Sequence, residues 1–187
     1  MADWAEPEPG GQTSDCRLFP LIGGIGASYR GYHTNELVRI ISGKLGCAAD
    51  YLYFPAIFDS EQELELVRSM ESFRGISRHW DRMDAAFVNV SNFPSYPDLA
   101  VEYRYDSSLR RRAVGRVLGH YYDIKGNIIR PRVDNVIQCS MEQLGRAGQV
   151  VALCSAHLRV ESLVGALGLG VISCLVLPRS LAERLLE

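Results

Sequence analysis

Short apolar runs alternate with amphipathic stretches along most of this chain, and the alternation predicts an α/β fold. Strands are predicted at four apolar runs: 18–22, 50–54, 85–90 and 133–139. Helices are predicted from about Asn35 to Gly46, after the capping box Ser60–Glu63, and over about 76–82. The polar, proline-containing stretch 92–108 predicts a loop.

The last forty residues show the pattern most clearly. A strand over 149–154, a helix over about 157–167, a strand over 171–177 and a helix over 180–186 are predicted in order. Two further capping boxes, Ser140–Gln143 and Ser180–Glu183, mark helix starts. A strand–helix–strand order predicts parallel strands with helices on both sides of the sheet.

One hairpin is predicted within this alternation. The apolar segments 117–122 and 127–129 flank the turn Asp123–Gly126, in which Gly126 supplies the positive φ that the turn requires. The expected architecture is therefore a three-layer α/β fold, with a mostly parallel sheet and a β-hairpin insertion.

Composition limits the protein class without naming a function. The 187 residues are 47% hydrophobic and 22% charged, with a net charge of −2, which excludes a disordered chain and a strongly basic nucleic-acid-binding surface. Residues 1–16 are acidic and rich in proline and glycine, so we expect a disordered leader followed by one domain over 17–187. The sequence shows neither a signal peptide nor an apolar run long enough to span a membrane, and the expected location is the cytoplasm.

The five cysteines, Cys16, Cys47, Cys139, Cys154 and Cys174, have no zinc-ligand spacing. We expect them to be thiols in a reducing compartment, with no metal and no cofactor. No nucleophile motif, no cysteine–histidine signature and no paired carboxylates are visible, so no catalytic residue is predicted. The only basic cluster, Arg110–Arg112, gives too small a field for nucleic-acid binding.

The order of several short motifs resembles the effector domain of SorC/DeoR-type sugar-binding transcriptional regulators. The motifs are Pro20–Gly26, Asn35–Leu37, Leu52–Ala56, Ala113–Gly115, Tyr121–Gly126, Val151–Ala156 with Arg159, and Leu181–Leu186. No single motif is specific; the ordered series over about 17–187 carries the resemblance.

The resemblance implies a fold similar to phosphosugar isomerases and CoA transferases, and a function in sensing a sugar or sugar phosphate. It also implies an oligomer. Full-length members carry a helix-turn-helix and a Gly/Thr-rich phosphate loop ahead of the matched part, and neither is visible in this sequence. DNA contact is therefore expected only through an attached or partner helix-turn-helix, and no membrane contact is expected.

A phosphosugar ligand would need amide donors, cations and hydroxyl partners. The loop Gly23, Gly24 and Gly26 is a candidate for amide donors to an anion, although it also fits a tight strand-to-helix turn. Asn35 is a candidate partner of sugar hydroxyls, or a plain helix-start residue.

The remaining candidates lie where strands end. Asn89 and Ser91 follow an apolar strand, at the edge where open α/β sheets place ligands, or they satisfy the local loop. His157 and Arg159 begin a helix after another strand, and Arg159 stands where the family has lysine. Arg116 replaces a family carboxylate, and either adds an anion contact or pairs with a nearby acid.

Two other classes of function stay open. The first is a sugar-phosphate isomerase-like enzyme on the same fold, which would need a general base that the departures at Arg116 and 177–179 remove. The second is a degenerate oligomerisation or interaction module that has lost its pocket.

Overall fold

A computed structural model describes residues 15–24, 33–95 and 107–187. The chain divides into two compact units: unit 1 comprises 1–79 with 135–138, and unit 2 comprises 80–134 with 139–187. Most of the expected leader, the candidate Gly26 and most of the expected 92–108 loop lie outside the described residues. Each unit is described by itself.

Unit 1 contains very short strands and three helices. Its elements are β1 (Arg17–Leu18), α1 (Thr34–Leu45), β2 (Ala48–Ala49), α2 (Glu61–Ser69) and α3 (Glu71–Trp80). β1 and β2 pair in parallel, and in the described part of unit 1 the other extended segments meet only at single bridges, Ile22–Gln138, Gly24–Pro55 and Ile57–Val136. The predicted strands at 18–22, 50–54 and 133–139 are therefore wrong as continuous strands, although 136–138 does pair with this unit.

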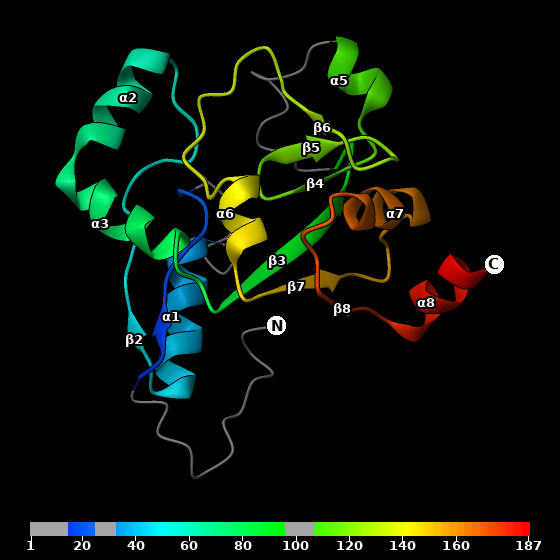
Figure 1. Cartoon of the computed structure of the whole chain (residues 1–187), viewed down its shortest axis with the longest axis horizontal. Helices are drawn as coiled ribbons and strands as arrows, with labels where there is room; N and C mark the ends of the chain where they lie inside the picture. Colours follow the sequence, from blue (N-terminus) through cyan, green and yellow to red (C-terminus); the bar gives the residue numbers. More distant parts are fainter. Residues whose placement is uncertain (1–14, 25–32, 96–106) are drawn as a thin grey trace. The chain divides into compact units, whose positions relative to one another are not determined.

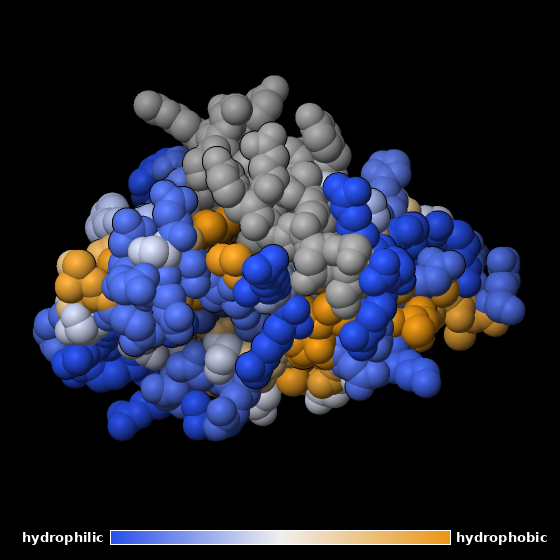
Figure 2. Space-filling model, turned by 90° about the horizontal axis from the view of Figure 1, so that it is seen from above, coloured by the Kyte–Doolittle hydropathy of each residue, from blue (hydrophilic) through white to orange (hydrophobic). Residues whose placement is uncertain are grey.

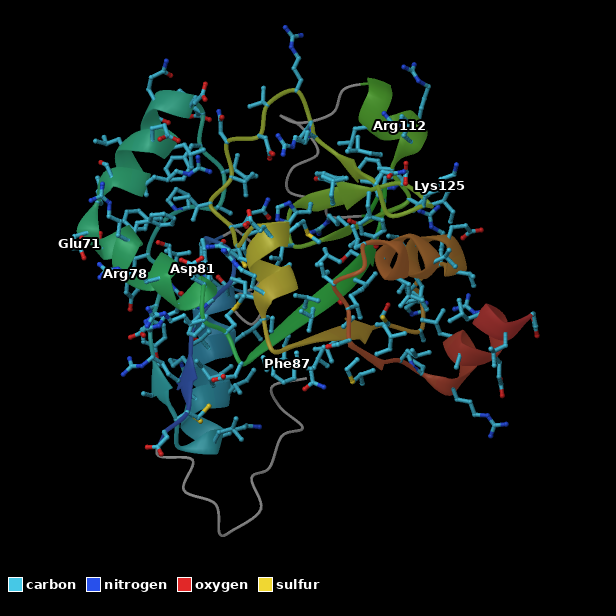
Figure 3. The ribbon with its side chains drawn as sticks, viewed as in Figure 1. Glu71, Arg78, Asp81, Phe87, Arg112 and Lys125 are labelled. Carbon is cyan, nitrogen blue, oxygen red and sulfur yellow. The ribbon has the colours of Figure 1, made fainter. Side chains whose placement is uncertain are left out.

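The helix ends in unit 1 follow local sequence signals. Gly46 ends α1 with φ 68°, and its N–H donates to the Ser42 carbonyl, as the predicted stop requires. Ser60 begins α2 by accepting a hydrogen bond from the Glu63 N–H at 3.2 Å. α3 begins five residues earlier than predicted, and an ion pair between Glu71 and Arg78 lies along it (Figure 3).

Unit 2 is built on a six-stranded sheet with strand order β6-β5-β4-β3-β7-β8 (Figure 1). Its strands are β3 (Ala85–Asn92), β4 (Gly115–Val117), β5 (His120–Tyr122), β6 (Ile128–Ile129), β7 (Gln149–Cys154) and β8 (Cys174–Val176). Its helices are α5 (Ser107–Arg112), α6 (Met141–Arg146), α7 (Val160–Gly168) and α8 (Arg179–Leu186). β3, β7 and β8 are parallel, whereas β3 to β6 are antiparallel neighbours, so the predicted α/β class is confirmed.

The predicted hairpin is a three-stranded meander with two turns. The segment 117–122 is broken at Leu118, which has φ 52°, so that β4 and β5 pair with each other. The second turn joins β5 to β6, and there Gly126 has φ 82°. A Cβ on Gly126 would lie 2.1 Å from the Gly168 carbonyl carbon, so the turn needs glycine both for its φ and for its close approach to α7.

α7 covers one face of the sheet in unit 2. Leu163 and Ala166 are fully buried, and a Cβ on Gly165 would lie 2.6 Å from the Asp123 carbonyl oxygen. The Tyr122 hydroxyl donates to the Ser162 carbonyl at 2.9 Å. Burial raises the pKa of this tyrosine, Cys154 raises it further, and Arg116 opposes the shift.

The opposite face of β3 is partly open. Ala86, Val88 and Val90 are buried, whereas Phe87 between them is 61% exposed. Figure 3 labels Phe87 beside β3. On the face of the molecule seen in Figure 2, apolar side chains interrupt the hydrophilic surface. Helix cover on both sides, expected from the apolar run, therefore does not extend to this position.

Of the two capping boxes predicted in unit 2, the structure confirms one and contradicts the other. Ser140 and Gln143 form the predicted reciprocal capping box at α6. The box predicted at Ser180 is wrong, because Pro178 is the N-cap of α8 and no side chain caps that helix. Among the described residues, no helix is both long and apolar enough to cross a membrane.

Candidate functional site

Three predicted site residues lie on one face of the sheet at the carboxyl end of β3. The Asn89 side chain donates from Nδ2 to the Ser91 hydroxyl oxygen at 2.8 Å. Ser91 is in register with Arg116 on β4, so these two side chains are neighbours across the strands. Arg116 donates from Nη1 to the Leu118 carbonyl at 2.8 Å. This face therefore presents an amide, a hydroxyl and a guanidinium in a row.

Asn92, at the end of β3, joins the strand to the segment before α7. Its Nδ2 donates to the His157 carbonyl at 3.0 Å, and its Oδ1 accepts from the Arg159 N–H at 2.9 Å. The same oxygen accepts from the buried Ser162 hydroxyl at 2.9 Å. The sequence prediction omitted Asn92, although its place in the polar end of an apolar strand was the available signal.

Arg159 is anchored at this end of the sheet by part of its guanidinium. Its Nη2 donates to the Phe93 carbonyl and, at 3.2 Å, to the Val114 carbonyl. Within the described parts of the chain, its Nε and Nη1 have no hydrogen-bond acceptor, and the residue is exposed. Two donors and the positive charge are therefore available to an anion.

The start of α7 adds donors to the same place. Arg159 is the N-cap residue, and no side chain caps the helix. Exposed His157 precedes it, and its ring makes no hydrogen bond or ion pair with any residue between 33–95 or 107–187. Helix N-termini favour anions, and here Glu161 in the first turn partly offsets that preference.

Arg184, which the sequence did not single out, supports the segment that leads into α7. Its Nη2 donates to the carbonyls of Ala156 and Leu158, each at 3.1 Å. The last helix therefore fixes the backbone on either side of His157. We name Asn89, Ser91, Asn92, Arg116, His157 and Arg159 the β3–α7 cluster: Asn89, Ser91 and Arg116 lie on one face of the sheet, whereas Asn92 lies on the face that α7 covers.

The candidates in unit 1 have structural roles instead. The Gly23 N–H donates to the Ile137 carbonyl at 3.0 Å, and the Gly24 N–H donates to the Phe54 carbonyl at 2.8 Å. A Cβ on Gly23 would lie 2.7 Å from the Pro55 carbonyl oxygen, which explains glycine there by close backbone packing. The expectation that these two amides are donors to an anion is therefore corrected: both are used within unit 1.

Asn35 acts as a partner for the backbone of a neighbouring segment. Its Nδ2 donates to the Leu52 carbonyl at 3.1 Å, and its Oδ1 accepts from the Leu52 N–H at 3.0 Å. Leu52 is only 1% exposed, so the asparagine satisfies both polar groups of a buried residue. The N-cap of α1 is His33, so Asn35 is not the capping residue, and its amide binds the Leu52 backbone in place of a sugar hydroxyl.

The described residues contain no group of three or more histidine, cysteine or acidic side chains placed to hold a metal ion. Burial raises the pKa of Cys139 to about 12, so this thiol is not a nucleophile near neutral pH. The chemistry that the β3–α7 cluster offers is hydrogen bonding and positive charge, which bind a polar or anionic ligand.

Comparison with known proteins agrees with the fold. Residues 3–187 match the family described as "Putative sugar-binding domain". The chain belongs to this family. The sugar-binding domain is similar to the sorbitol operon regulator of Klebsiella pneumoniae, with 26% identity covering 94% of this chain and 58% of that protein.

Solved structures extend the comparison to three dimensions. The probable sor operon regulator from Shigella flexneri superposes with a TM-score of 0.84 at 25% identity, covering 91% of this chain and 69% of that one. A transcriptional regulator from Streptococcus pneumoniae TIGR4 has the same fold, with a TM-score of 0.85 at 17% identity, covering 99% of this chain and 72% of that one. The sugar-binding domain spans less than two thirds of the curated relative, at 58% of its length.

Proposed function

We propose that this sugar-binding domain senses a sugar or sugar phosphate and modulates DNA binding by an attached or partner helix-turn-helix. The observation that carries the proposal is the anchored Arg159, whose Nη2 is held by two carbonyls while its Nε and Nη1 have no acceptor among the described residues. The sorbitol operon regulator, named for control of an operon, supports the regulatory role.

The ligand is an anionic carbohydrate in this proposal. An arginine with two available donors binds a phosphate group better than it binds a neutral sugar. The row of Asn89, Ser91 and Arg116 supplies an amide, a hydroxyl and a further guanidinium for polar groups of the ligand. The exposed His157 ring adds a further hydrogen-bonding group next to Arg159.

Signalling follows from differential affinity. A ligand that binds one arrangement of the protein better than another shifts the population toward that arrangement, and affinity for an operator changes with it. We further propose that the domain works as a homo-oligomer in the cytoplasm.

A thermal-shift screen against sugars and sugar phosphates tests the sensing role. A true ligand at 100 times its dissociation constant stabilises the folded protein by about 2.7 kcal/mol. We expect at least one sugar phosphate to do so, and its unphosphorylated sugar to do so less. If no carbohydrate raises the melting temperature, the proposal fails and an interaction module remains.

Titration calorimetry on two arginine variants then tests the site. Arg159→Gln should weaken binding roughly 10-fold or more, because charge-assisted hydrogen bonds contribute about 1.5–3 kcal/mol. Arg68→Gln is the matched control, because Arg68 lies on α2 of unit 1 and forms an exposed ion pair with Glu65. Equal affinities of the two variants would show that the ligand does not bind at the β3–α7 cluster.

A further inference from the structure

The small sheet of unit 1 brings two cysteines side by side. β1 and β2 are parallel, with Arg17 opposite Ala48 and Leu18 opposite Ala49. One residue earlier on each strand, the same register places Cys16 opposite Cys47. The Ala48 N–H donates to the Cys16 carbonyl at 3.1 Å, so the two segments are still adjacent at this position.

A side-chain ion pair fixes the register between β1 and β2 in addition to the backbone hydrogen bonds. Arg17 donates from Nη1 to both carboxylate oxygens of Asp50, at 2.9 and 3.0 Å, across the two segments. The Asp50 N–H also donates to the Leu18 carbonyl at 2.9 Å. A slip of one residue would break all of these contacts, so they determine the register of β1 against β2, and extending this register by one residue places Cys16 opposite Cys47.

We propose that Cys16 and Cys47 form a site of reversible oxidation, at which an intramolecular disulfide joins the two strands of this sheet. Neighbouring strands lie about 4.7–4.9 Å apart, within the 4.4–6.8 Å range of Cα separations that disulfides span. Residues in register project to the same side of a strand pair, so the two thiols share one side of β1 and β2. Both residues are partly exposed, so an oxidant in solution reaches them.

The other three cysteines lack this arrangement. Cys139 is buried, and burial raises the pKa of its thiol to about 12. Cys154 lies opposite Val90 on β3, and Cys174 lies opposite Val151 on β7, so neither has a cysteine as its register partner. Burial also raises the pKa of the Cys154 thiol, which makes it less reactive.

The oxidant is hydrogen peroxide, which takes two electrons. One thiolate attacks the peroxide to give a sulfenic acid and hydroxide, and the second thiol displaces water from the sulfenic sulfur to form the S–S bond. Two thiols and one peroxide thus give one disulfide and two waters, and a dithiol reductant reverses the reaction. The product closes the chain from Cys16 to Cys47, a stretch that contains Gly23, Gly24 and α1.

Peptide mapping of the full chain tests this site directly, because each of the five cysteines falls in a different tryptic peptide. The reduced protein is treated with peroxide, remaining thiols are alkylated, and the digest is analysed without reductant. We expect peptide 1–17 linked to peptide 45–68, two hydrogens lighter than the sum of the reduced peptides. The linked species should form at a rate independent of protein concentration, and should disappear with a dithiol reductant.

Single variants and a stability measurement complete the test. Cys16→Ser and Cys47→Ser should each abolish the link, whereas Cys174→Ser should keep it. The oxidised wild-type chain should melt several degrees higher than the reduced one, because the link restricts the unfolded chain. Three results would overturn the proposal: linkage to another cysteine, linkage to a second chain, or sulfinic acid on both residues without a link. All three are measured on the wild-type chain, so none of them depends on the folding of a variant.

Discussion

Different kinds of contact stabilise the interior of each of the two units. Unit 2 is organised by a continuous ladder, in which β3 pairs with β7 over six residues and with β4 on its other side. Unit 1 has a strand pair of two residues and three single bridges. Side chain-to-backbone contacts therefore replace sheet pairing in unit 1, and individual polar residues have larger structural roles there.

Two asparagines show the difference most directly. Asn35 in unit 1 gives both amide atoms to the buried Leu52 backbone, where no water can replace them. Asn92 in unit 2 bonds mainly to exposed segments before α7, on a strand that its ladder already holds. Asn35 thus bonds to backbone groups that a neighbouring strand would otherwise satisfy, whereas Asn92 connects β3 to the segment before α7.

The largest expected effect is at a glycine in unit 2. Gly126→Ala combines a left-handed φ, at about 1–2 kcal/mol, with overpacking against Gly168, at typically 1–3 kcal/mol. Gly46→Ala in unit 1 is the matched control, because Gly46 also has a positive φ but nothing lies within 4 Å of its added Cβ. Urea unfolding measures both. Equal losses would show that contact with α7 contributes nothing.

The next effect compares the two asparagines. Asn35→Ala should lower the free energy of unfolding by about 2–4 kcal/mol, because it leaves a buried N–H and a buried carbonyl unsatisfied. Asn92→Ala should lower it by only about 1 kcal/mol, because water reaches the exposed partners and the buried Ser162 hydroxyl still has the Val114 carbonyl as an acceptor at 2.7 Å. Hydrogen exchange at the Leu52 amide should accelerate in the first variant alone. The reverse order of stabilities would contradict the proposed difference between the units.

A smaller effect is expected at the buried tyrosine of unit 2. Tyr122→Phe removes the hydrogen bond to the Ser162 carbonyl and should lower stability by about 1 kcal/mol. Because the folded state raises the pKa of Tyr122, wild-type stability should be constant below the ordinary value of 10.0 and fall as the pH rises beyond it. Chemical unfolding of both proteins between pH 8 and 11 measures this. A parallel decline in Tyr122→Phe would assign the alkaline loss to another group.

The smallest effect is at the turn between β5 and β6. Burial raises the pKa of Asp123, but hydrogen bonds from Asn127 and Lys125 and the charge of Arg112 outweigh it and lower the pKa overall. The stabilisation is therefore fully present above the ordinary value of 3.8 and is lost as the pH falls from there through the lower pKa of the folded state. Asp123→Asn should reduce this acid loss by less than about 1 kcal/mol, measured as melting temperature against pH. An unchanged pH profile would contradict the assignment.

The labelled side chains in Figure 3 place Arg112 and Lys125 around this turn, on α5 and in the turn itself. Arg112 Nη2 lies 3.9 Å from Asp123 Oδ2, a loose ion pair on an exposed side chain. Exposed pairs of this kind contribute little to stability, so the backbone hydrogen bonds to Asp123 dominate. The basic cluster 110–112 therefore has a local electrostatic partner.

The sequence predicted strands more accurately where they belong to a continuous sheet than where extended segments form single bridges. The strand at 149–154 was predicted at its exact bounds, and the Ser140–Gln143 box was confirmed, because both are local patterns supported by a continuous sheet. The runs at 50–54 and 133–139 also contain apolar residues, but in the described part of the chain 133–139 forms single bridges at Val136 and Gln138, and the bridge nearest to 50–54 is at Pro55. Apolar content shows that a segment is buried, not that it has a strand beside it.

The candidate site was partly predictable for a similar reason. Asn89, Ser91, His157 and Arg159 were predicted because polar residues at the carboxyl ends of parallel strands meet at one sheet edge, and their role in a ligand site stays a prediction. Asn92 and Arg184 were missed, since their roles depend on carbonyl groups more than 20 residues away in sequence. Gly23 and Gly24 were misjudged as anion donors because a sequence does not show which amides are already bonded.

The sequence by itself determined the α/β class, the family and the helix boundaries that depend on short-range caps, because these follow from periodicity and from contacts within a few residues. The tertiary structure alone decided which extended segments pair, which amides are used, and which cysteines stand side by side. Those outcomes depend on register between distant segments, and one residue of slip exchanges every side chain between the two faces of a strand.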